Sequence, residues 1–391
     1  MAKSTYRPVP LQTAHTLESA GETFSRVHDA RKGRGAVSNI QGRYETAQRV
    51  GFDDGWANED EDDAAVLRTV ITEETAKSIL SRNKSPDLPF NVSLNPYRGC
   101  EHGCVYCFAR PTHAYLGLSP GLDFESRIFA KVNAPELLRK ELARPGYMAE
   151  TITVGINTDA YQPCERELQI TRRVLQILDD CGHPAALITK SALIERDIDI
   201  LSAMASRRQV IAAVTIATLD PVLARKLEPR AATPSRRLRV IRTLSEAGIP
   251  VSVSIAPIIP FINEPELESI VAAAADAGAR RAGYTVLRLP WEVNPLFQQW
   301  LLTYFPERAK RVMNRIREMR GGKDNDSDFA TRMRGEGVWA DLIRQRFEKA
   351  VQRSSMHERG WFDMLDASQF IAPARAVKAA PSALSGQFNL F

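Results

Sequence analysis

Three of the five cysteines in the chain, Cys100, Cys104 and Cys107, stand close together on a stretch that also contains Gly99 and Gly103. Thiolates on one short glycine-containing loop can converge on a soft metal centre. The number three is informative, because a cubane [4Fe–4S] cluster held by three cysteines leaves one iron without a protein ligand. An open position of this kind distinguishes catalytic from structural sites. The alternatives are a zinc site that lacks one ligand, or cysteines placed by chance.

The spacing C-x3-C-x2-C, with the aromatic Tyr106 just before the last cysteine, resembles the signature of the radical S-adenosylmethionine (radical SAM) superfamily. This resemblance implies that the open iron chelates the amino and carboxylate groups of S-adenosylmethionine. It also implies that one electron cleaves the sulfonium to give methionine and a 5′-deoxyadenosyl radical. We therefore expect a [4Fe–4S] cluster and S-adenosylmethionine as cofactors, with a flavodoxin or ferredoxin as electron donor.

Composition places few restrictions on the partner. Of the 391 residues, 44% are hydrophobic and 25% are charged, as in ordinary globular proteins. No apolar run is long enough for a membrane span, and no signal peptide is visible at the N-terminus. Cysteines gathered in one motif fit a reducing compartment, so we expect a cytoplasmic protein without disulfides. The net charge of +5 permits a nucleic-acid partner without demanding one.

The elements that position the cysteines form a regular series from residue 91 onward. Six predicted strands alternate with predicted helices, and the strands begin at Asn91, Thr151, Ala185, Val210, Val251 and Ala282. One or two further helices are predicted over 295–320. Such an alternation indicates a parallel α/β sheet with helices outside it. Between a barrel and an open sheet, the resemblance decides, since it implies a partial (β/α)6 TIM-type barrel.

Four regions of the chain differ in composition. Residues 1–64 include a small basic patch at 31–35 and are expected to form a flexible, disordered N-terminal arm. Residues 65–294 would form the barrel and residues 295–366 a basic helical extension. Residues 367–391 would be a flexible tail. The basic side chains of the extension fit either a solvated helix face or a surface that contacts phosphates.

Polar side chains follow the predicted strands at their carboxyl ends, where barrels of this type hold their ligands. Asp159 suits ribose hydroxyls, Lys190 a carboxylate, and Tyr106 the adenine. The resemblance implies that the positions of Lys190 and Thr215 contact S-adenosylmethionine. The full set of expected cofactor contacts is Tyr106, Asn157, Asp159, Lys190, Ser191, Thr215 and Ser254. The alternative is structural: Ser191 could start a helix, Asp159 could shape a turn, and Ser254 could be an ordinary polar residue of the barrel.

The run Asn95-Pro-Tyr-Arg-Gly-Cys100 resembles the spore photoproduct lyase-like branch, also described as DNA-repair photolyase-like. This branch implies a DNA substrate. The chain departs from it at Ile156, where the lyase has a hydrogen-donating cysteine. Cys164 and Tyr161 are the weak candidates for another donor, although a free cysteine is more often a small buried hydrophobe.

The last five residues suggest a docking motif. Gln387, Phe388, Leu390 and Phe391 resemble the motif by which bacterial repair and replication proteins bind the sliding clamp, with Phe388 as a departure. Two apolar side chains would fill a pocket while the Gln amide makes hydrogen bonds at its edge. The alternative is a tail that packs on its own domain.

The residues and the resemblance together predict a radical SAM enzyme of lyase type that acts on a damaged or modified base in DNA. One alternative is radical modification of RNA or of a peptide. Another is a non-enzymatic iron–sulfur or zinc protein that binds nucleic acid. Release of 5′-deoxyadenosine would separate the enzymes from the binding protein.

Overall fold

The computed structural model describes residues 32–45, 67–357 and 362–374. Its centre is a sheet of six parallel strands that lie side by side in sequence order. They are β3 (Val92–Leu94), β6 (Ile152–Val154), β7 (Ala185–Thr189), β8 (Val210–Thr215), β9 (Val251–Ile258) and β10 (Arg281–Val286). The short β2 (Leu80–Arg82) adds to β3 in antiparallel orientation. The predicted partial (β/α)6 barrel is thereby confirmed.

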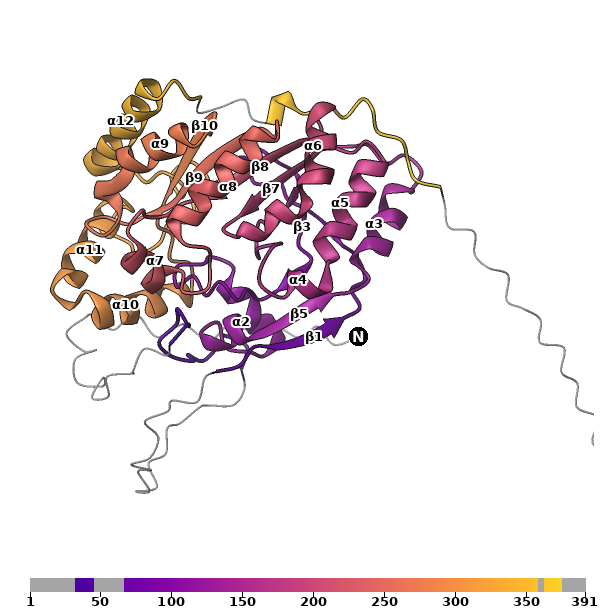
Figure 1. Ribbon diagram of the computed structural model, residues 1–391. Helices are drawn as coiled ribbons and strands as arrows, with labels where there is room; N and C mark the ends of the chain where they lie inside the picture. The colour runs from indigo at the N-terminus through magenta and orange to yellow at the C-terminus, as the bar shows by residue number, and fades with distance from the viewer. Residues whose placement is uncertain (1–31, 46–66, 358–361, 375–391) are drawn as a thin grey trace, which may run out of the picture.

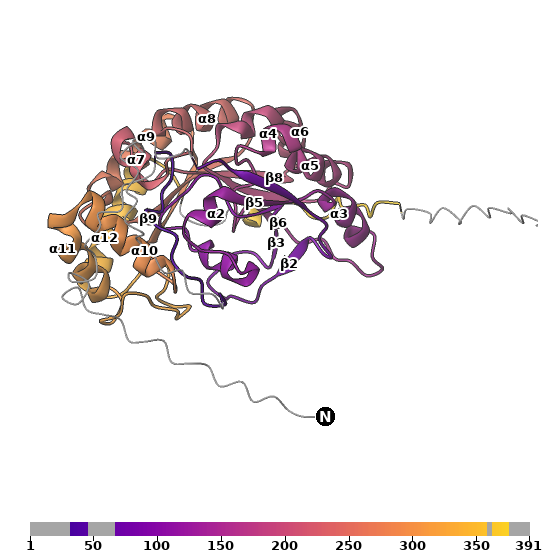
Figure 2. The same ribbon diagram turned by 90° about the horizontal axis from the view of Figure 1, so that it is seen from below.

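Helices cover the outer side of this sheet in an arc, which Figure 2 shows from below. They are α3 (Ala134–Leu142), α4 (Glu165–Leu168), α5 (Ile170–Asp180), α6 (Ile198–Ser206), α7 (Pro221–Leu227), α8 (Pro234–Glu246) and α9 (Leu267–Asp276). Several begin where the sequence supplies a cap. Asp220 accepts a hydrogen bond from the amide of Val222, and a proline at the first position of α7 needs no amide partner. Among the described residues no helix is both long and apolar enough to cross a bilayer.

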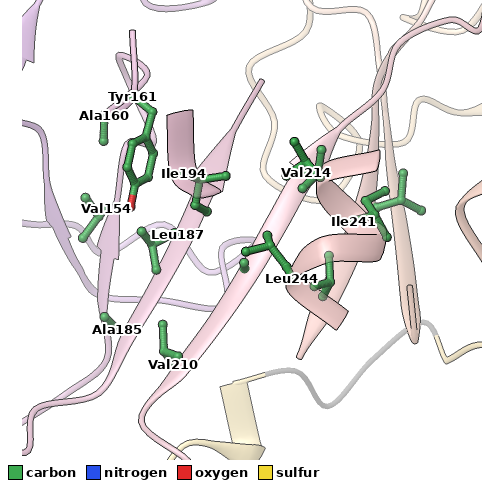
Figure 3. Packing of buried hydrophobic residues seen from close by; sticks show 14 of the residues in the cluster. Val154, Ala160, Tyr161, Ala185, Leu187, Ile194, Val210, Val214, Ile241 and Leu244 are labelled. Carbon is green, nitrogen blue, oxygen red and sulfur yellow. The ribbon is translucent and has the colours of Figure 1, made fainter. Parts of the chain in front are cut away.

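The main hydrophobic core lies between the sheet and these helices. Figure 3 shows Val214 of β8 near Ile241 and Leu244 of α8. It also shows Val154 of β6 and Leu187 of β7 near Tyr161 and Ile194. Because successive side chains of a strand point to opposite faces, the intervening residues face the inside of the barrel. That inner face carries mostly small residues, many with hydroxyl groups: Ser93, Thr153, Ala186, Ala213, Thr215, Ser252, Ser254, Gly283 and Thr285. The larger Ile188 and Ile211 share it. Because most of these side chains are small, they leave space inside the barrel.

A second, three-stranded sheet joins β1 (Val70–Glu74), β5 (Arg127–Lys131) and β4 (Tyr97–Arg98). Figure 1 shows β1 and β5 below the main sheet, together with α2 (Leu122–Ser126). This layer lies beside the three clustered cysteines, because β4 ends two residues before Cys100.

The C-terminal extension consists of α10 (Val293–Tyr304), α11 (Pro306–Glu318), α12 (Gly337–Arg353) and the short η4 (Phe362–Met364). The prediction of helices over 295–320 is confirmed. The extension is not a separate unit, however, because α12 packs on α9 and its Ile343 and Phe347 belong to the main core. The Phe347 ring lies 4.7 Å from that of Tyr284 on β10. A boundary at residue 294 therefore cuts through one continuous core.

Both predicted flexible ends need correction where the structure describes them. Residues 32–45, placed in a disordered arm, include Arg34, Ala36 and Val37, which are all buried. Residues 367–371, placed in a flexible tail, pack on the barrel, where the amide of Ile371 donates to the carbonyl of Cys181. The rest of the arm and the tail lie outside the described residues. So does the candidate clamp motif, Gln387, Phe388, Leu390 and Phe391.

Candidate functional site

The three clustered cysteines lie on the loop between β4 and η1 (Arg110–Leu116), which we call the cluster loop, residues 99–108. Cys100 and Cys104 are buried, and each belongs to a different hydrophobic cluster. Cys107 is half-buried and packs against both clusters. Burial raises the pKa of the Cys104 thiol to about 12, although Lys190 lowers it. Thiolates at this depth require a positively charged partner.

The residues fit an iron–sulfur cluster. Three sulfur donors on one loop are the ligand set of a [4Fe–4S] cluster with an open iron. In the described part of the chain, no three His, Cys, Asp or Glu side chains are grouped around a position for one metal ion. A [4Fe–4S] cubane requires a different arrangement. Each thiolate binds a different iron, so the three sulfur atoms lie further apart than the ligands of a single metal ion.

A buried arginine holds the backbone of the cluster loop. The Arg110 guanidinium donates to the carbonyl of Cys104 over 2.8 Å and to that of Gly103 over 3.2 Å. It also pairs with the carboxylate of Glu125 on α2, and neither side chain is exposed to solvent. Because charge-assisted hydrogen bonds are the strong ones, this pair defines the shape of the loop between its first two cysteines and its third.

The N-terminal segment 32–45, which we call the strap, completes this arrangement. The amides of Gly35 and Ala36 donate to the Glu125 carboxylate over 2.9 and 2.8 Å. The Arg34 guanidinium donates to the Glu125 backbone carbonyl over 2.7 Å. A Cβ atom at Gly35 would lie 1.7 Å from the carbonyl oxygen of Gly103, so only glycine allows this approach. These contacts could not be predicted from the sequence, where Arg34 is part of a small basic patch in an arm expected to be flexible.

Asp159 connects the cluster loop to the end of β7. Its carboxylate accepts hydrogen bonds from the Thr189 hydroxyl over 2.7 Å, from the Lys190 amide over 2.7 Å and from the Tyr161 amide over 2.9 Å. The His102 ring nitrogen Nδ1 lies 3.3 Å from it. Burial alone would raise the pKa of Asp159, but His102 and these donors lower it to about 2. Through these contacts the carboxylate joins the cluster loop to the end of β7, while its contact with ribose hydroxyls stays a prediction.

A buried network of charges lies next to the cluster loop. The Tyr106 hydroxyl donates to Glu228, and Glu228 pairs with Arg237 of α8. Burial opposes ionisation of Glu228, yet Arg237 and Lys190 keep its pKa below the ordinary value. The Lys190 ammonium nitrogen lies 5.9 Å from the centre of the Tyr106 ring. The predicted contacts Tyr106 and Lys190 are thus neighbours, while no role had been predicted for Glu228 or Arg237.

Thr215 lies at the same end of the barrel, where its carbonyl accepts a hydrogen bond from Arg237 over 2.9 Å. It is directly opposite Ser254 of β9, which in turn is opposite Gly283 of β10. The row points into the barrel, and a Cβ atom at Gly283 would meet no heavy atom within 4 Å. Lys190 follows directly after β7, the strand beside Thr215. The structure therefore brings Lys190, Thr215 and Ser254 together beside open space.

The other predicted residues have different surroundings. Ser191 caps the short η2 (Ala192–Asp197), since its hydroxyl accepts the Leu193 amide over 3.1 Å, as in the structural alternative. Asn157 is exposed, and its amide donates to the Asn95 side chain over 2.9 Å. Tyr161 and Cys164 belong to the main hydrophobic core. Both side chains are buried there, and their role as hydrogen donors to a substrate stays a prediction.

Residues 94–274 match the model of the radical SAM superfamily. An uncharacterized protein of Mycobacterium tuberculosis is 36% identical over 242 residues, which are 61% of this chain and 70% of that protein. An uncharacterized protein of Methanocaldococcus jannaschii is 29% identical over 192 residues, or 49% of this chain and 68% of that protein.

Two solved structures are among those similar to this chain. A mutant of spore photoproduct lyase has a TM-score of 0.49 and 14% identity, and the match covers 74% of this chain and 81% of that one. Streptococcus suis SuiB bound to S-adenosylmethionine has a TM-score of 0.34 and 11% identity, with 54% of this chain and 39% of that one covered.

Proposed function

Because this chain belongs to the radical SAM superfamily, whose members use a [4Fe–4S] cluster and S-adenosylmethionine, we propose that it is a lyase-like enzyme acting on a damaged or modified base in DNA. The observation that carries the chemistry is the cluster loop, whose three thiols lie at the mouth of a barrel with an open, hydroxyl-lined interior. The DNA substrate is supported by the resemblance of 95–100 to the lyase-like branch.

Cys100, Cys104 and Cys107 would hold the cluster. When bound, the cluster supplies the electron that cleaves S-adenosylmethionine into methionine and a 5′-deoxyadenosyl radical. The Arg110–Glu125 pair keeps the loop backbone in place during this step, since it binds the loop carbonyls directly. A loop that is held by buried hydrogen bonds needs no reorganisation when the cofactor arrives.

Lys190 would bind the carboxylate of S-adenosylmethionine. Its ammonium group is buried beside Cys104 and Glu228, and these groups raise its pKa although burial lowers it, so it stays charged. Thr215 and Ser254 would offer hydroxyls to the same ligand from the neighbouring strands. Asp159 and Glu228 would not contact the ligand in this role. Asp159 would position His102, and Glu228 would position Tyr106.

The hydrogen returned to the product would not come from a cysteine of this chain. Three of the five cysteines lie on the cluster loop, and the other two, Cys164 and Cys181, are buried in the main core. With Ile156 at the position of the lyase cysteine, the proposal requires another donor. It could be the 5′-deoxyadenosine that forms when the radical takes a hydrogen atom from the substrate, or an external hydrogen-atom donor. A flavodoxin or ferredoxin would deliver the electron.

The proposal is tested with anaerobically reconstituted protein, dithionite and S-adenosylmethionine. We expect 5′-deoxyadenosine as a product, and none from Cys104→Ala, which loses a cluster ligand. Cys181→Ala is the matched control, because its thiol lies in the core, and it should keep both iron and activity. Lys190→Ala should bind S-adenosylmethionine about 10- to 100-fold more weakly with unchanged iron content, as for loss of one charge-assisted hydrogen bond. A protein with a verified cluster and no cleavage product would overturn the proposed chemistry.

A further inference from the structure

Three aromatic side chains gather around one arginine at the edge of the barrel mouth. Tyr44, Tyr115 and Trp291 are 51%, 65% and 59% exposed, which is unusual for rings of this size. They come from three segments that are far apart in the sequence: the strap, η1 and the loop after β10. We call them the aromatic triad. Scattered exposed apolar residues need no explanation, but a group assembled from three segments does.

Arg43 organises the triad. Its guanidinium carbon lies 4.2 Å from the centre of the Trp291 ring, 5.5 Å from that of Tyr44 and 6.0 Å from that of Tyr115. The Arg43 side chain is itself fixed by a 2.8 Å hydrogen bond to Glu292. Tyr44 and Tyr115 also contact each other, with ring centres 5.0 Å apart. The rings are therefore held on one side, while much of their surface faces solvent.

The backbone at Trp291 supports a role beyond packing. Its φ angle is +47°, in the left-handed region that bulky residues rarely adopt. A ring that gained its stability from burial would not be displayed at 59% exposure on such a backbone. Strained conformations of this kind cluster where a side chain must be aimed at a ligand.

The triad lies next to the site of the proposed chemistry. Tyr115 is on η1, which begins three residues after Cys107, and Trp291 follows the carboxyl end of β10. Two further exposed rings occur in the same region, each beside an arginine. Phe108, adjacent to Cys107, has the Arg288 guanidinium carbon 5.9 Å from its ring centre, and Phe329 has that of Arg332 at 4.5 Å.

We propose that the aromatic triad is a stacking platform for an unpaired base of single-stranded nucleic acid beside the barrel mouth. This inference rests on the proposed function, because it gives the substrate strand a place next to the radical. Every base has a π-face, so exposed aromatic rings bind single strands with little sequence preference. The Arg43 guanidinium holds the rings in place through its cation–π contacts with them. Protein interfaces are also enriched in aromatic residues and arginine, so self-association of the chain is measured as a separate outcome.

The test measures binding of a fluorescently labelled oligothymidylate to the reconstituted full chain by anisotropy, without reductant. We expect the single strand to bind more tightly than a duplex of the same length. Tyr115→Ala and Trp291→Ala should each weaken binding by about 5- to 100-fold, the effect of losing one stacked base. Tyr115→Phe keeps the ring and should bind like the wild type. Val338→Ala, which removes an exposed apolar side chain on α12, is a remote control that should also change nothing.

The same protein samples are assayed for cleavage of S-adenosylmethionine, so that the two proposals can fail separately. Cleavage without binding of the single strand would refute the platform and keep the chemistry. Equal binding by Tyr115→Ala and the wild type would also refute the platform. Self-association of the chain that Tyr115→Ala abolishes would show that the triad is a protein interface, and this too would overturn it. Binding without cleavage would support the platform and refute the chemistry.

Discussion

The strap, near the N-terminus, packs at one end of the barrel, and residues 366–371, near the C-terminus, pack at the other. The two segments make contacts of different chemistry. At the carboxyl ends of the strands, the strap and the cluster loop enclose ionised groups, including the Arg110–Glu125 pair. At the amino ends, residues 366–371 close the barrel with an aromatic ring: Phe370 packs on Tyr147 and His183 with ring centres 5.5 and 5.2 Å away. Buried charges cost desolvation energy, whereas aromatic packing does not. The difference teaches that the carboxyl end carries buried ion pairs, which are costly to fold and therefore point to a function there.

The largest effect should come from breaking a buried pair at the mouth. Arg237→Leu would leave the buried Glu228 carboxylate without the arginine that pairs with it, and should lower the free energy of unfolding by about 3–5 kcal/mol. Urea denaturation monitored by circular dichroism measures this loss. Arg344→Ala removes a solvent-exposed partner of Glu348 and should change stability little. Similar losses for both variants would contradict the distinction between the two kinds of charge.

A smaller effect should follow from separating the strap from the cluster loop. Gly35→Ala would place a methyl group on the carbonyl oxygen of Gly103, so one of the two segments must move. We expect stability to fall by about 1–3 kcal/mol, as for other overpacked sites. Reconstituted protein should also lose iron to a chelator faster than the wild type, which absorbance measures directly.

The matched control is Gly283→Ala, where the new methyl group would meet no heavy atom within 4 Å. Its iron retention should equal that of the wild type. If Gly35→Ala retains iron equally well, the strap does not support the cluster loop.

The features that could be predicted from the sequence are those encoded locally. The spacing of Cys100, Cys104 and Cys107 is a property of one short segment. The six strands could be located because each carries its own run of apolar residues and is followed by a helix. Strand order then followed, because consecutive βα units pair with their neighbours.

What the sequence analysis missed depends on contacts between distant segments. Arg34 bonds to Glu125, and these residues lie 91 positions apart, so neither predicts the other. Asp159 follows a strand end as predicted, but its contacts with His102 and with the Lys190 amide could not be inferred from the sequence. A polar residue at a strand end can bind a ligand or position a residue that does so, and only its partners distinguish the two.

The smallest expected effect concerns pH at the amino end of the barrel. Burial lowers the pKa of His183 to about 4, although its hydrogen bond to the Pro184 carbonyl raises it. In the unfolded chain the imidazole titrates near its ordinary pKa of 6.5, so between the two values only the unfolded state is protonated. The stability that the neutral His183 contributes is therefore fully present above its pKa in the unfolded chain, 6.5. It is lost as the pH falls toward the pKa in the folded protein, about 4.

We expect this histidine to account for about 2 kcal/mol of the stability that the protein loses between about pH 7 and about pH 5. His183→Gln, which can still bond to the Tyr147 hydroxyl, should lose that much less over the same interval in urea denaturation. Part of the pH dependence should remain, because burial also lowers the pKa of His113, beside the cluster loop, to about 4. Cleavage of S-adenosylmethionine by His183→Gln should match the wild type at neutral pH, since the residue lies at the end without buried charge. An unchanged pH dependence in this variant would show that His183 is not the source of the lost stability. Impaired cleavage would show that the two ends of the barrel are not independent.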